Sequence, residues 1–263
     1  MIRFGVSTAV LLAACAAMGQ TGDWRGSPAP FRLTPQQKAY LDQVLQAWEQ
    51  RNADVKTFEC DFTRWQYDPV FGDANKPKYR DDGHLKYAAP DQGRFDIKGE
   101  RPEKWICNGN SIFEFNYAKK QLIEYKLPPD MQGKAIANSP LPFLFGAKAE
   151  ELKRRYFLRT ITPAGAKGQI WLEAHPKFQQ DAANFKRAEL ILIAQGMTPY
   201  GLQIYLPNGK NRTAYQFYNI VSNDPLRFFK GDPFHAVAPP FWKKIVEQPQ
   251  TARADRPAGV PKR

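Results

Sequence analysis

The sequence predicts a mainly β protein, and three observations carry that prediction. The chain of 263 residues contains 22 proline and 18 glycine residues, which favour turns, and 13% of its residues are aromatic. Only one long segment has apolar residues at helical spacing, whereas apolar and polar residues alternate in many short segments. We therefore expect strands joined by turns, in one domain or two small ones.

The N-terminal segment has the features of an export signal. Arg3 precedes an uncharged stretch of 15 residues, which is shorter than the roughly 20 apolar residues of a membrane-spanning helix. We expect a signal peptide over 1–19 and a flexible linker over 20–33. Two processing routes remain open. Cleavage before Cys15, whose "LAAC" context is similar to a lipobox, would leave an acylated N-terminus that anchors the chain; ordinary cleavage would follow Gly19.

One amphipathic helix is predicted at 35–51. Thr34 is its N-cap with Gln37 three residues on, and Pro35 occupies the first turn. Its apolar face consists of residues at helical spacing, Leu41, Val44, Leu45 and Trp48. That face must cover another part of the fold, so these residues are candidates for a lid.

From Val55 onward the apolar period changes to two, which predicts half-buried antiparallel strands. The first three are "TFECDFTRW" (57–65), "GHLKYAAP" (83–90) and "GRFDIKG" (93–99). The side chains expected on one shared face of these strands are Phe58, Cys60, Phe62, Leu85, Tyr87, Phe95 and Ile97.

The segment 103–127 predicts three further strands. Asn108-Gly109 is a strong hairpin signal, and a second break falls at 117–120. We expect the bulky residues of this segment to face the same side as those before it, namely Trp105, Phe113, Phe115, Ile123 and Tyr125.

The second half of the chain continues the strand pattern. A short helix is expected within 147–156, and strands are expected at 155–161, 168–174, 185–194, 199–206 and 212–220. The total is about ten strands. The basic tail 248–263 has no apolar period and is expected to be disordered.

The apolar loop "NSPLPFLFG" (138–146) cannot be a regular strand, because Pro140 and Pro142 lack backbone donors. Two interpretations remain open for its side chains Leu141, Phe143 and Phe145. They form either a flap over a cavity mouth or an ordinary loop that packs on the core.

Composition argues against several classes of function. The net charge of +12 is scattered along an exported chain, which argues against binding of nucleic acid. A need for solubility, or an interaction with an anionic surface, explains the positive charge. The histidines are isolated and catalytic or phosphate-binding motifs are lacking, so we expect no enzyme, cofactor or metal site. Cys60 and Cys107 either pair in a disulfide or stay free and buried.

The aromatic residues on one face of a long sheet either fill a packed core or line a cavity. If they line a cavity, the expected ligand-binding residues are Phe58, Phe62, Leu85, Tyr87, Phe95, Trp105, Phe113, Phe115 and Tyr125.

The motifs "TFECDFTRW", "GHLKYAAPDQGRFDI", "EKWICNGNSIFEFNYAKKQLIEYKL", "NSPLPFLFG", "WLEAHPK" and "LQIYLPNGKNRTAYQFYNI" follow one another in unbroken order between about 36 and 237. In this order the chain resembles the bacterial outer-membrane lipoprotein carrier family (LolA- or LolB-like). The resemblance implies a half-open, strongly curved antiparallel β-barrel over 34–247, whose concave face binds acyl chains under helical lids. It also implies a periplasmic monomer that takes lipoproteins from an inner-membrane transporter to the outer membrane.

The sequence departs from the family at one position. The carriers have an arginine, which helps hold the lid closed, immediately before the proline that ends the second strand; here Ala89 precedes Pro90. Arg64 or Arg94 could take its place.

Three functions remain in competition. The leading one is an exported carrier that binds lipoprotein or lipid acyl chains in the cavity and transfers them across the periplasm. An envelope sensor or interaction module would use the same fold without a transfer step. A hydrolase with a dispersed site is the third.

Overall fold

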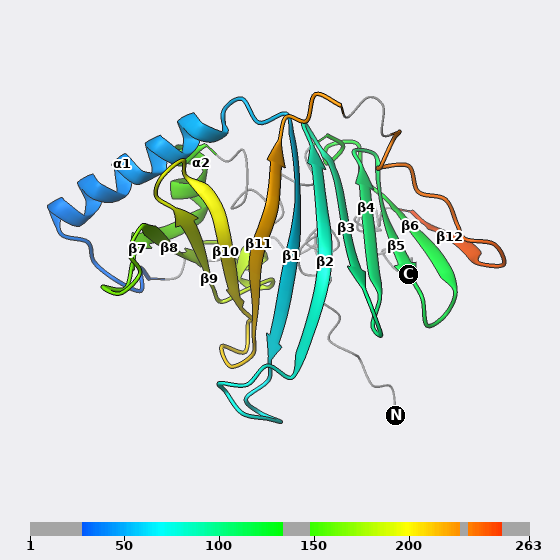
Figure 1. The fold of residues 1–263 in the computed structure, drawn as a ribbon, viewed down its shortest axis with the longest axis horizontal. Coiled ribbons are helices and arrows are strands. Elements are labelled where there is room, and N and C mark those ends of the chain that lie inside the picture. The colour runs from blue at the N-terminus through cyan, green and yellow to red at the C-terminus, as the bar shows by residue number, and fades with distance from the viewer. Residues whose placement is uncertain (1–27, 134–147, 227–230, 249–263) are drawn as a thin grey trace, which may run out of the picture.

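The computed structural model describes residues 28–133, 148–226 and 231–248 (Figure 1). Several predicted features therefore lie outside the described residues. These are the signal peptide with Cys15, most of the linker 20–33, the loop 138–146 with Leu141, Phe143 and Phe145, and nearly all of the tail 248–263.

In the described part of the chain, twelve strands form one sheet, in the order β12-β6-β5-β4-β3-β2-β1-β11-β10-β9-β8-β7. Their bounds are β1 (Thr57–Tyr67), β2 (Tyr79–Ala88), β3 (Gln92–Lys98), β4 (Glu103–Asn108), β5 (Ser111–Asn116), β6 (Gln121–Lys126), β7 (Tyr156–Thr160), β8 (Gln169–Pro176), β9 (Arg187–Ile193), β10 (Thr198–Tyr205), β11 (Arg212–Ser222) and β12 (Lys243–Glu247).

The sheet is curved and has two free edges, β12 and β7 (Figure 1). The N-terminal strand β1 lies in its middle, antiparallel to β2 on one side and to β11 on the other. Neighbouring strands are antiparallel except β12, which runs parallel to β6. The prediction of a mainly β, half-open, strongly curved antiparallel barrel is confirmed, although β12 was not among the predicted strands.

Helix α1 (Pro35–Asn52) begins as the sequence predicts. The N–H of Gln37 donates to Oγ1 of Thr34, and the N–H of Thr34 donates to Oε1 of Gln37, which completes a capping box. Helix α2 (Ala149–Arg155) is the predicted short helix, and α3 (Gln179–Ala182) lies in a segment expected to be a turn. Both α1 and α2 lie beside β7–β10, on the other side of β1 from β12 (Figure 1).

The larger apolar cluster, which we call the concave cluster, lies on the face that the sheet curves around. It combines residues of β1–β5, β7–β11, α1 and α2, including Phe62, Trp105, Leu158, Leu190 and Trp48. Side chains from strands far apart in the sheet can meet in one cluster only if the sheet bends around them. The fold therefore has one interior, with α1 and α2 packed into it.

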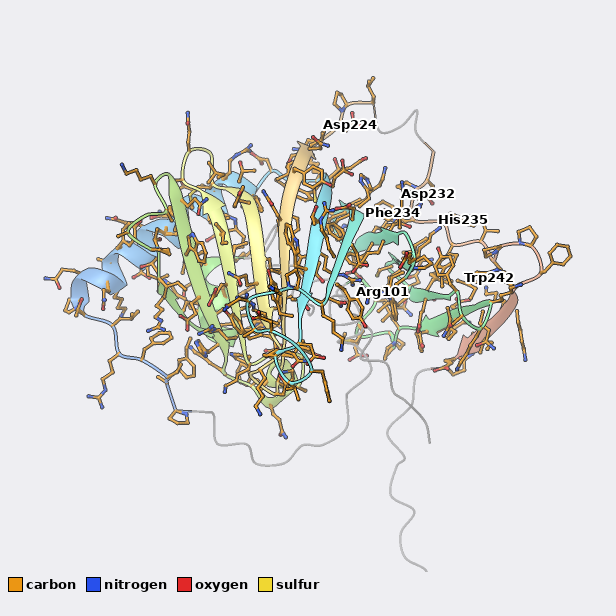
Figure 2. All side chains as sticks on the ribbon, turned by 60° about the horizontal axis from the view of Figure 1, so that its bottom comes forward. Arg101, Asp224, Asp232, Phe234, His235 and Trp242 are labelled. Carbon is orange, nitrogen blue, oxygen red and sulfur yellow. The ribbon has the colours of Figure 1, made fainter. Side chains whose placement is uncertain are left out.

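The smaller apolar cluster, which we call the convex cluster, lies on the opposite face of β2–β6. It consists of Ala88, Ile106, Phe113, Phe115, Leu122 and Phe234. Phe234 belongs to a segment, the C-terminal strap (231–242), that follows the outer face of these strands and leads into β12 (Figure 2). The carbonyl of Pro233 accepts from Nη1 of Arg94 on β3 at 3.3 Å.

Candidate functional site

The centre of the concave cluster is an aromatic stack on the middle strands. The ring of Phe62 stacks on Phe95, with centroids 5.0 Å apart, and meets the edge of Tyr215 at 5.6 Å. Gly83 is the cross-strand partner of Phe62, and a Cβ on it would lie 2.3 Å from the Phe62 ring. The absence of a side chain at Gly83 therefore lets the Phe62 ring lie flat against β2.

Seven of the nine predicted cavity residues lie in or against the concave cluster. Phe58, Phe62, Leu85, Phe95 and Trp105 are buried there, and Tyr87 and Tyr125 are partly buried against it. Strand alternation and register explain the agreement, since Phe58 opposes Tyr87 and Phe95 opposes both Leu85 and Trp105. Ligand binding by these residues stays a prediction.

The prediction that Phe113 and Phe115 share this face is wrong. Both lie in the convex cluster, with Ile106. Cys107 pairs with Ile112 across the turn, so odd positions of β4 face the same side as even positions of β5. The sequence held this signal, because a two-residue turn after Asn108 fixes that register.

The predicted lid residues Leu41, Val44, Leu45 and Trp48 are all buried in the concave cluster. Leu45 and Trp48 have no exposed surface. Yet Nε1 of Trp48 has no hydrogen-bond partner within the described residues. A buried, unsatisfied indole N–H is unfavourable by about 1–3 kcal/mol, so this donor is available to a ligand acceptor.

Two polar contacts link α1 to α2. The backbone N–H of Ala149, at the start of α2, donates to Oε2 of Glu49 at 3.1 Å. Nζ of Lys153 lies 2.8 Å from Oδ1 of Asp42, and 3.0 Å from Oε1 of Glu150 on its own helix. Because these groups are partly exposed, the contacts hold α1 in place only weakly.

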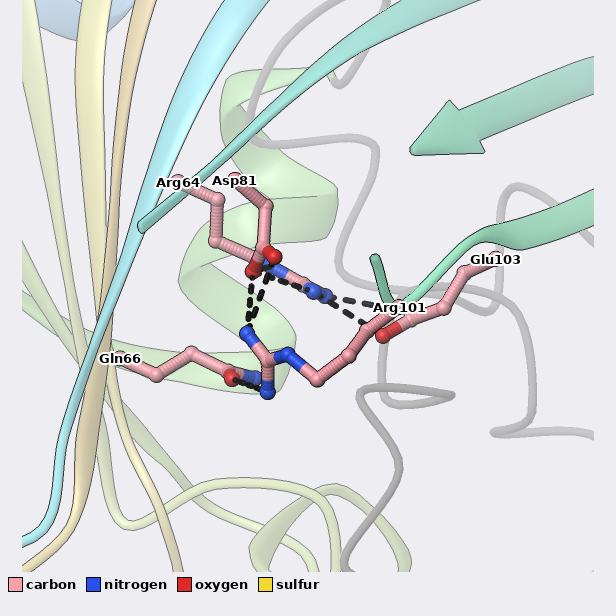
Figure 3. A network of polar contacts seen from close by, with 5 residues as sticks. All are labelled: Arg64, Gln66, Asp81, Arg101 and Glu103. Atoms are coloured by element: carbon pink, nitrogen blue, oxygen red, sulfur yellow. Dashed lines mark hydrogen bonds and ion pairs between the residues drawn. The ribbon is translucent and has the colours of Figure 1, made fainter. Parts of the chain in front are cut away.

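The apolar surface ends in a buried ion network (Figure 3). Arg64 follows Phe62 on the same face of β1 and is fully buried. Its guanidinium donates to Asp81 at 2.8 Å and to Glu103 at 2.9 and 3.1 Å, while Arg101 donates to Asp81 at 2.9 Å and to Gln66 at 3.3 Å. The network joins β1, β2 and β4 and balances two cations with two carboxylates.

Burial and hydrogen bonding together shift the pKa values of the groups in and beside the network. Desolvation lowers the pKa of Arg64, but the hydrogen bonds to Glu103 and Asp81 outweigh it and keep that pKa above its ordinary value. Burial raises the pKa of the adjacent Tyr215. Sequence reasoning did not predict the network, because charged residues on an apolar face break the alternation on which it relied.

Neither arginine proposed to replace the family's lid-holding arginine is bonded to α1. Arg64 bonds to Asp81 and Glu103 of the sheet. Arg94 lies on the convex side, where it bonds to Asp96 and to the Pro233 carbonyl. That expectation is corrected, because strong partners on the sheet and strap already occupy both guanidinium groups.

Neither Cys60 nor Cys107 forms a disulfide, and both thiols are buried in the concave cluster. They lie on β1 and β4, two strands that β2 and β3 separate. Burial raises the pKa of Cys60, which keeps the thiol neutral and unreactive. Of the two alternatives that the sequence left open, the structure has the buried thiols without a disulfide.

A hollow of about 660 Å³ lies around β2, where that strand leaves the long β1–β2 connection. Its lining carries charges of both signs, including Lys78, Arg80, Asp82, Lys98 and Glu100. Such a lining does not suit an acyl chain, since burial of ionised groups against hydrocarbon is strongly unfavourable. The concave cluster is therefore the better candidate for an apolar ligand.

The described residues hold no group of three or more His, Cys, Asp or Glu side chains placed to bind a metal ion. Within the same residues, no helix combines the length and apolar character needed to span a membrane.

The curved open sheet with helices packed into its concave side defines a half-open β-barrel of the lipoprotein-carrier type. The family described as "Outer membrane lipoprotein carrier protein LolA" matches residues 53–228, and the chain belongs to this family. The match ends before the C-terminal strap and β12.

The solved structures that are similar to this chain include the following three. An uncharacterized conserved protein from Thermus thermophilus is 8% identical over 79% of this chain and 99% of that one, with a TM-score of 0.45. A LolA superfamily protein from Nitrosomonas europaea is 11% identical over 72% and 96%, with a TM-score of 0.36. The lipoprotein LppX from Mycobacterium tuberculosis is 9% identical over 71% and 97%, with a TM-score of 0.40.

Among curated protein sequences, none matches the chain at a significant level.

Proposed function

We propose that this protein is an exported carrier that binds acyl chains of lipoproteins or lipids against the concave cluster and transfers them across the periplasm. The observation that carries the proposal is the composition of that cluster. Its apolar face is shared between a rigid sheet and α1, which contributes Leu41, Val44, Leu45 and Trp48. Because α1 covers the apolar sheet surface mainly through side-chain packing, another apolar molecule can take its place on that surface.

The energetics favour such an exchange. Burial of an acyl chain is worth about 0.8 kcal/mol per methylene, so a lipoprotein crosses water readily only inside an apolar site. The sheet surface from which α1 withdraws would supply that site. The helix's own apolar face would then contact the bound chain and stay out of water.

The unpartnered Nε1 of Trp48 gives a second, polar reason. Lipoprotein acyl chains are attached through ester or amide carbonyls, which accept hydrogen bonds. A carbonyl beside Trp48 would satisfy the donor and fix the position of the chain's polar end.

The wider assignment rests on the sequence and the family. We propose that Leu141, Phe143 and Phe145 form a flap at the mouth of the site, that the chain is a periplasmic monomer, and that it receives its cargo from an inner-membrane transporter. A lipidated Cys15 would anchor it in a membrane.

The lid contacts offer a test with a matched control. Asp42→Asn combined with Glu49→Gln takes the negative charge out of both polar contacts between α1 and α2, whereas Glu150→Gln neutralises only the partner that Lys153 has on its own helix. We expect the double variant to bind a fluorescent fatty acid about threefold faster or more in stopped-flow measurements, because each contact is worth a few tenths of a kcal/mol. Glu150→Gln should bind at the wild-type rate.

Two outcomes would count against the carrier. A wild-type chain that does not bind the fatty acid would refute the acyl site. A chain that binds it but never releases an acylated peptide to acceptor vesicles would support the sensor without a transfer step.

A further inference from the structure

The turn that leads into β12 contains an unusual residue. The N–H of Trp242 donates to the carbonyl of Pro239 at 3.1 Å, Pro240 is the second residue of the turn, and Phe241 is the third, with φ of 66°. Proline followed by a positive φ is the pattern of a type II turn, in which glycine or asparagine normally takes the third position. A bulky side chain in that position strains the backbone.

Among the described residues, no packing contact of the Phe241 ring compensates for that strain. Phe241 is 102% exposed, more than any other large apolar residue among those described. A phenylalanine that is both strained and unpacked points to a contact outside the molecule.

The base of this turn is held rigidly. Trp242 packs edge-to-face on Tyr117, with centroids 5.1 Å apart, and lies 6.3 Å from Phe115. The N–H of Lys243 donates to the carbonyl of Lys120 at 3.0 Å, after which β12 pairs with β6. Phe241 therefore projects from a fixed support beside the β5–β6 turn.

The same edge is basic. Lys119, Lys120 and Lys243 are exposed, and the structure gives none of them an ion pair with another described residue. Lys244 alone is neutralised, by Glu124 at 2.7 Å. Arg94 and Asp96, which lie near Tyr117, neutralise each other.

We propose that this docking edge, made up of Tyr117, Lys119, Lys120, Phe241 and Lys243, binds the surface of an anionic lipid bilayer. The Phe241 ring would enter the headgroup region, while the three ammonium groups contact lipid phosphates. A single aromatic tip without a surrounding groove fits a soft, deformable surface better than a folded partner. The docking edge does not overlap the concave cluster, so this inference does not depend on acyl binding.

The test is flotation of the full chain with vesicles of phosphatidylcholine, with and without phosphatidylglycerol. We expect tighter binding to the vesicles that contain phosphatidylglycerol. Phe241→Ala should weaken that binding about tenfold, through loss of the buried ring, and Phe241→Leu should keep most of it. Lys120→Gln and Lys243→Gln should each weaken it about fivefold and reduce its salt dependence.

Phe71→Ala is the matched control. Phe71 is 81% exposed in the β1–β2 connection, where Asp68 and Asp73 balance Lys76 and Lys78. Its loss should leave vesicle binding unchanged. Phe241→Ala should keep the wild-type unfolding midpoint and fatty-acid affinity, which separates this proposal from the carrier proposal.

The proposal would be overturned if phosphatidylglycerol did not strengthen vesicle binding by the wild-type chain, or if Phe241→Ala bound the vesicles as tightly as the wild type. It would also be overturned if Phe71→Ala weakened vesicle binding as much as Phe241→Ala does.

Discussion

The two apolar clusters lie on opposite faces of one sheet and differ in what covers them. The convex cluster is covered by the C-terminal strap, which places Phe234 among Ile106, Phe113 and Leu122 and then continues into a strand of the same sheet. The concave cluster is covered partly by α1, through buried side chains and two polar contacts to α2.

This difference separates a permanent cover from a removable one. Moving the strap away would break the backbone hydrogen bonds between β12 and β6 as well as the packing of Phe234. Moving α1 away exposes apolar surface but breaks few hydrogen bonds, and an acyl chain can replace what is lost. The concave cluster is thus suited to ligand exchange, and the convex cluster to stability.

The largest effect is expected where the concave cluster ends in its ion network. Arg64→Met should lower the free energy of unfolding by about 3–5 kcal/mol, because Asp81 and Glu103 lose their buried partner. Lys78→Met removes an exposed pair with Asp68 and should leave the free energy of unfolding almost unchanged. Equal losses in urea unfolding would mean that the network does not anchor this face.

The permanent cover is tested by Phe234→Ala. We expect a loss of about 3 kcal/mol in urea unfolding, since the substitution leaves a cavity under the strap, and no change in fatty-acid affinity. Val237→Ala in the same strap, at a side chain 63% exposed, should have almost no effect on either quantity. Weaker fatty-acid binding by Phe234→Ala would mean that the convex cluster also takes part in ligand binding, contrary to the distinction drawn between the two faces.

The removable cover is tested by Trp48→Phe. The smaller ring loses packing, but the unsatisfied N–H is lost too, so stability should change by no more than about 1–2 kcal/mol. The affinity for an acyl ester should fall, while that for an alkane of the same length should hold. If both ligands bind as before, Trp48 does not donate to a ligand carbonyl.

The smallest effect concerns Glu189, which lies outside both clusters on β9. Burial raises its pKa above the ordinary 4.5, helped by the nearby Glu173, although Arg187 opposes the shift. The folded chain therefore holds this proton more strongly than the unfolded chain, and stability falls as pH rises through the raised pKa.

Glu189→Gln removes that dependence. The variant should be more stable than the wild type at neutral pH and lose this advantage near pH 4.5, in unfolding curves measured across the range. Its fatty-acid affinity should match that of the wild type, which would show that affinity does not merely follow stability. An advantage that is the same at every pH would contradict the raised pKa.

Regular alternation made much of the fold predictable. Phe58, Cys60 and Phe62 on one strand and the capping box at Thr34 are local signals, and both were interpreted correctly. The prediction for Phe113 was wrong because Ile112 and Phe113 are both apolar, so their residue types do not show which of them faces the concave side. Only the register set by the β4–β5 turn decides this.

The strap and β12 could not be predicted in the same way. The segment 231–242 has no apolar period, and Phe234 is buried only because a distant sheet face needs cover. Strand β12 has mostly exposed side chains and pairs in parallel with a strand more than a hundred residues earlier. Neither contact leaves a local pattern in the sequence.

The most direct test of acyl-chain binding to the concave cluster locates the bound chain. A fatty acid with a terminal diazirine would be bound to the full chain, photolysed and mapped residue by residue with mass spectrometry. We predict adducts on the concave cluster, at residues such as Phe62, Leu85 and Trp48. Adducts confined to the convex cluster, at Ile106 or Phe113, or spread over the charged hollow around β2, would contradict it.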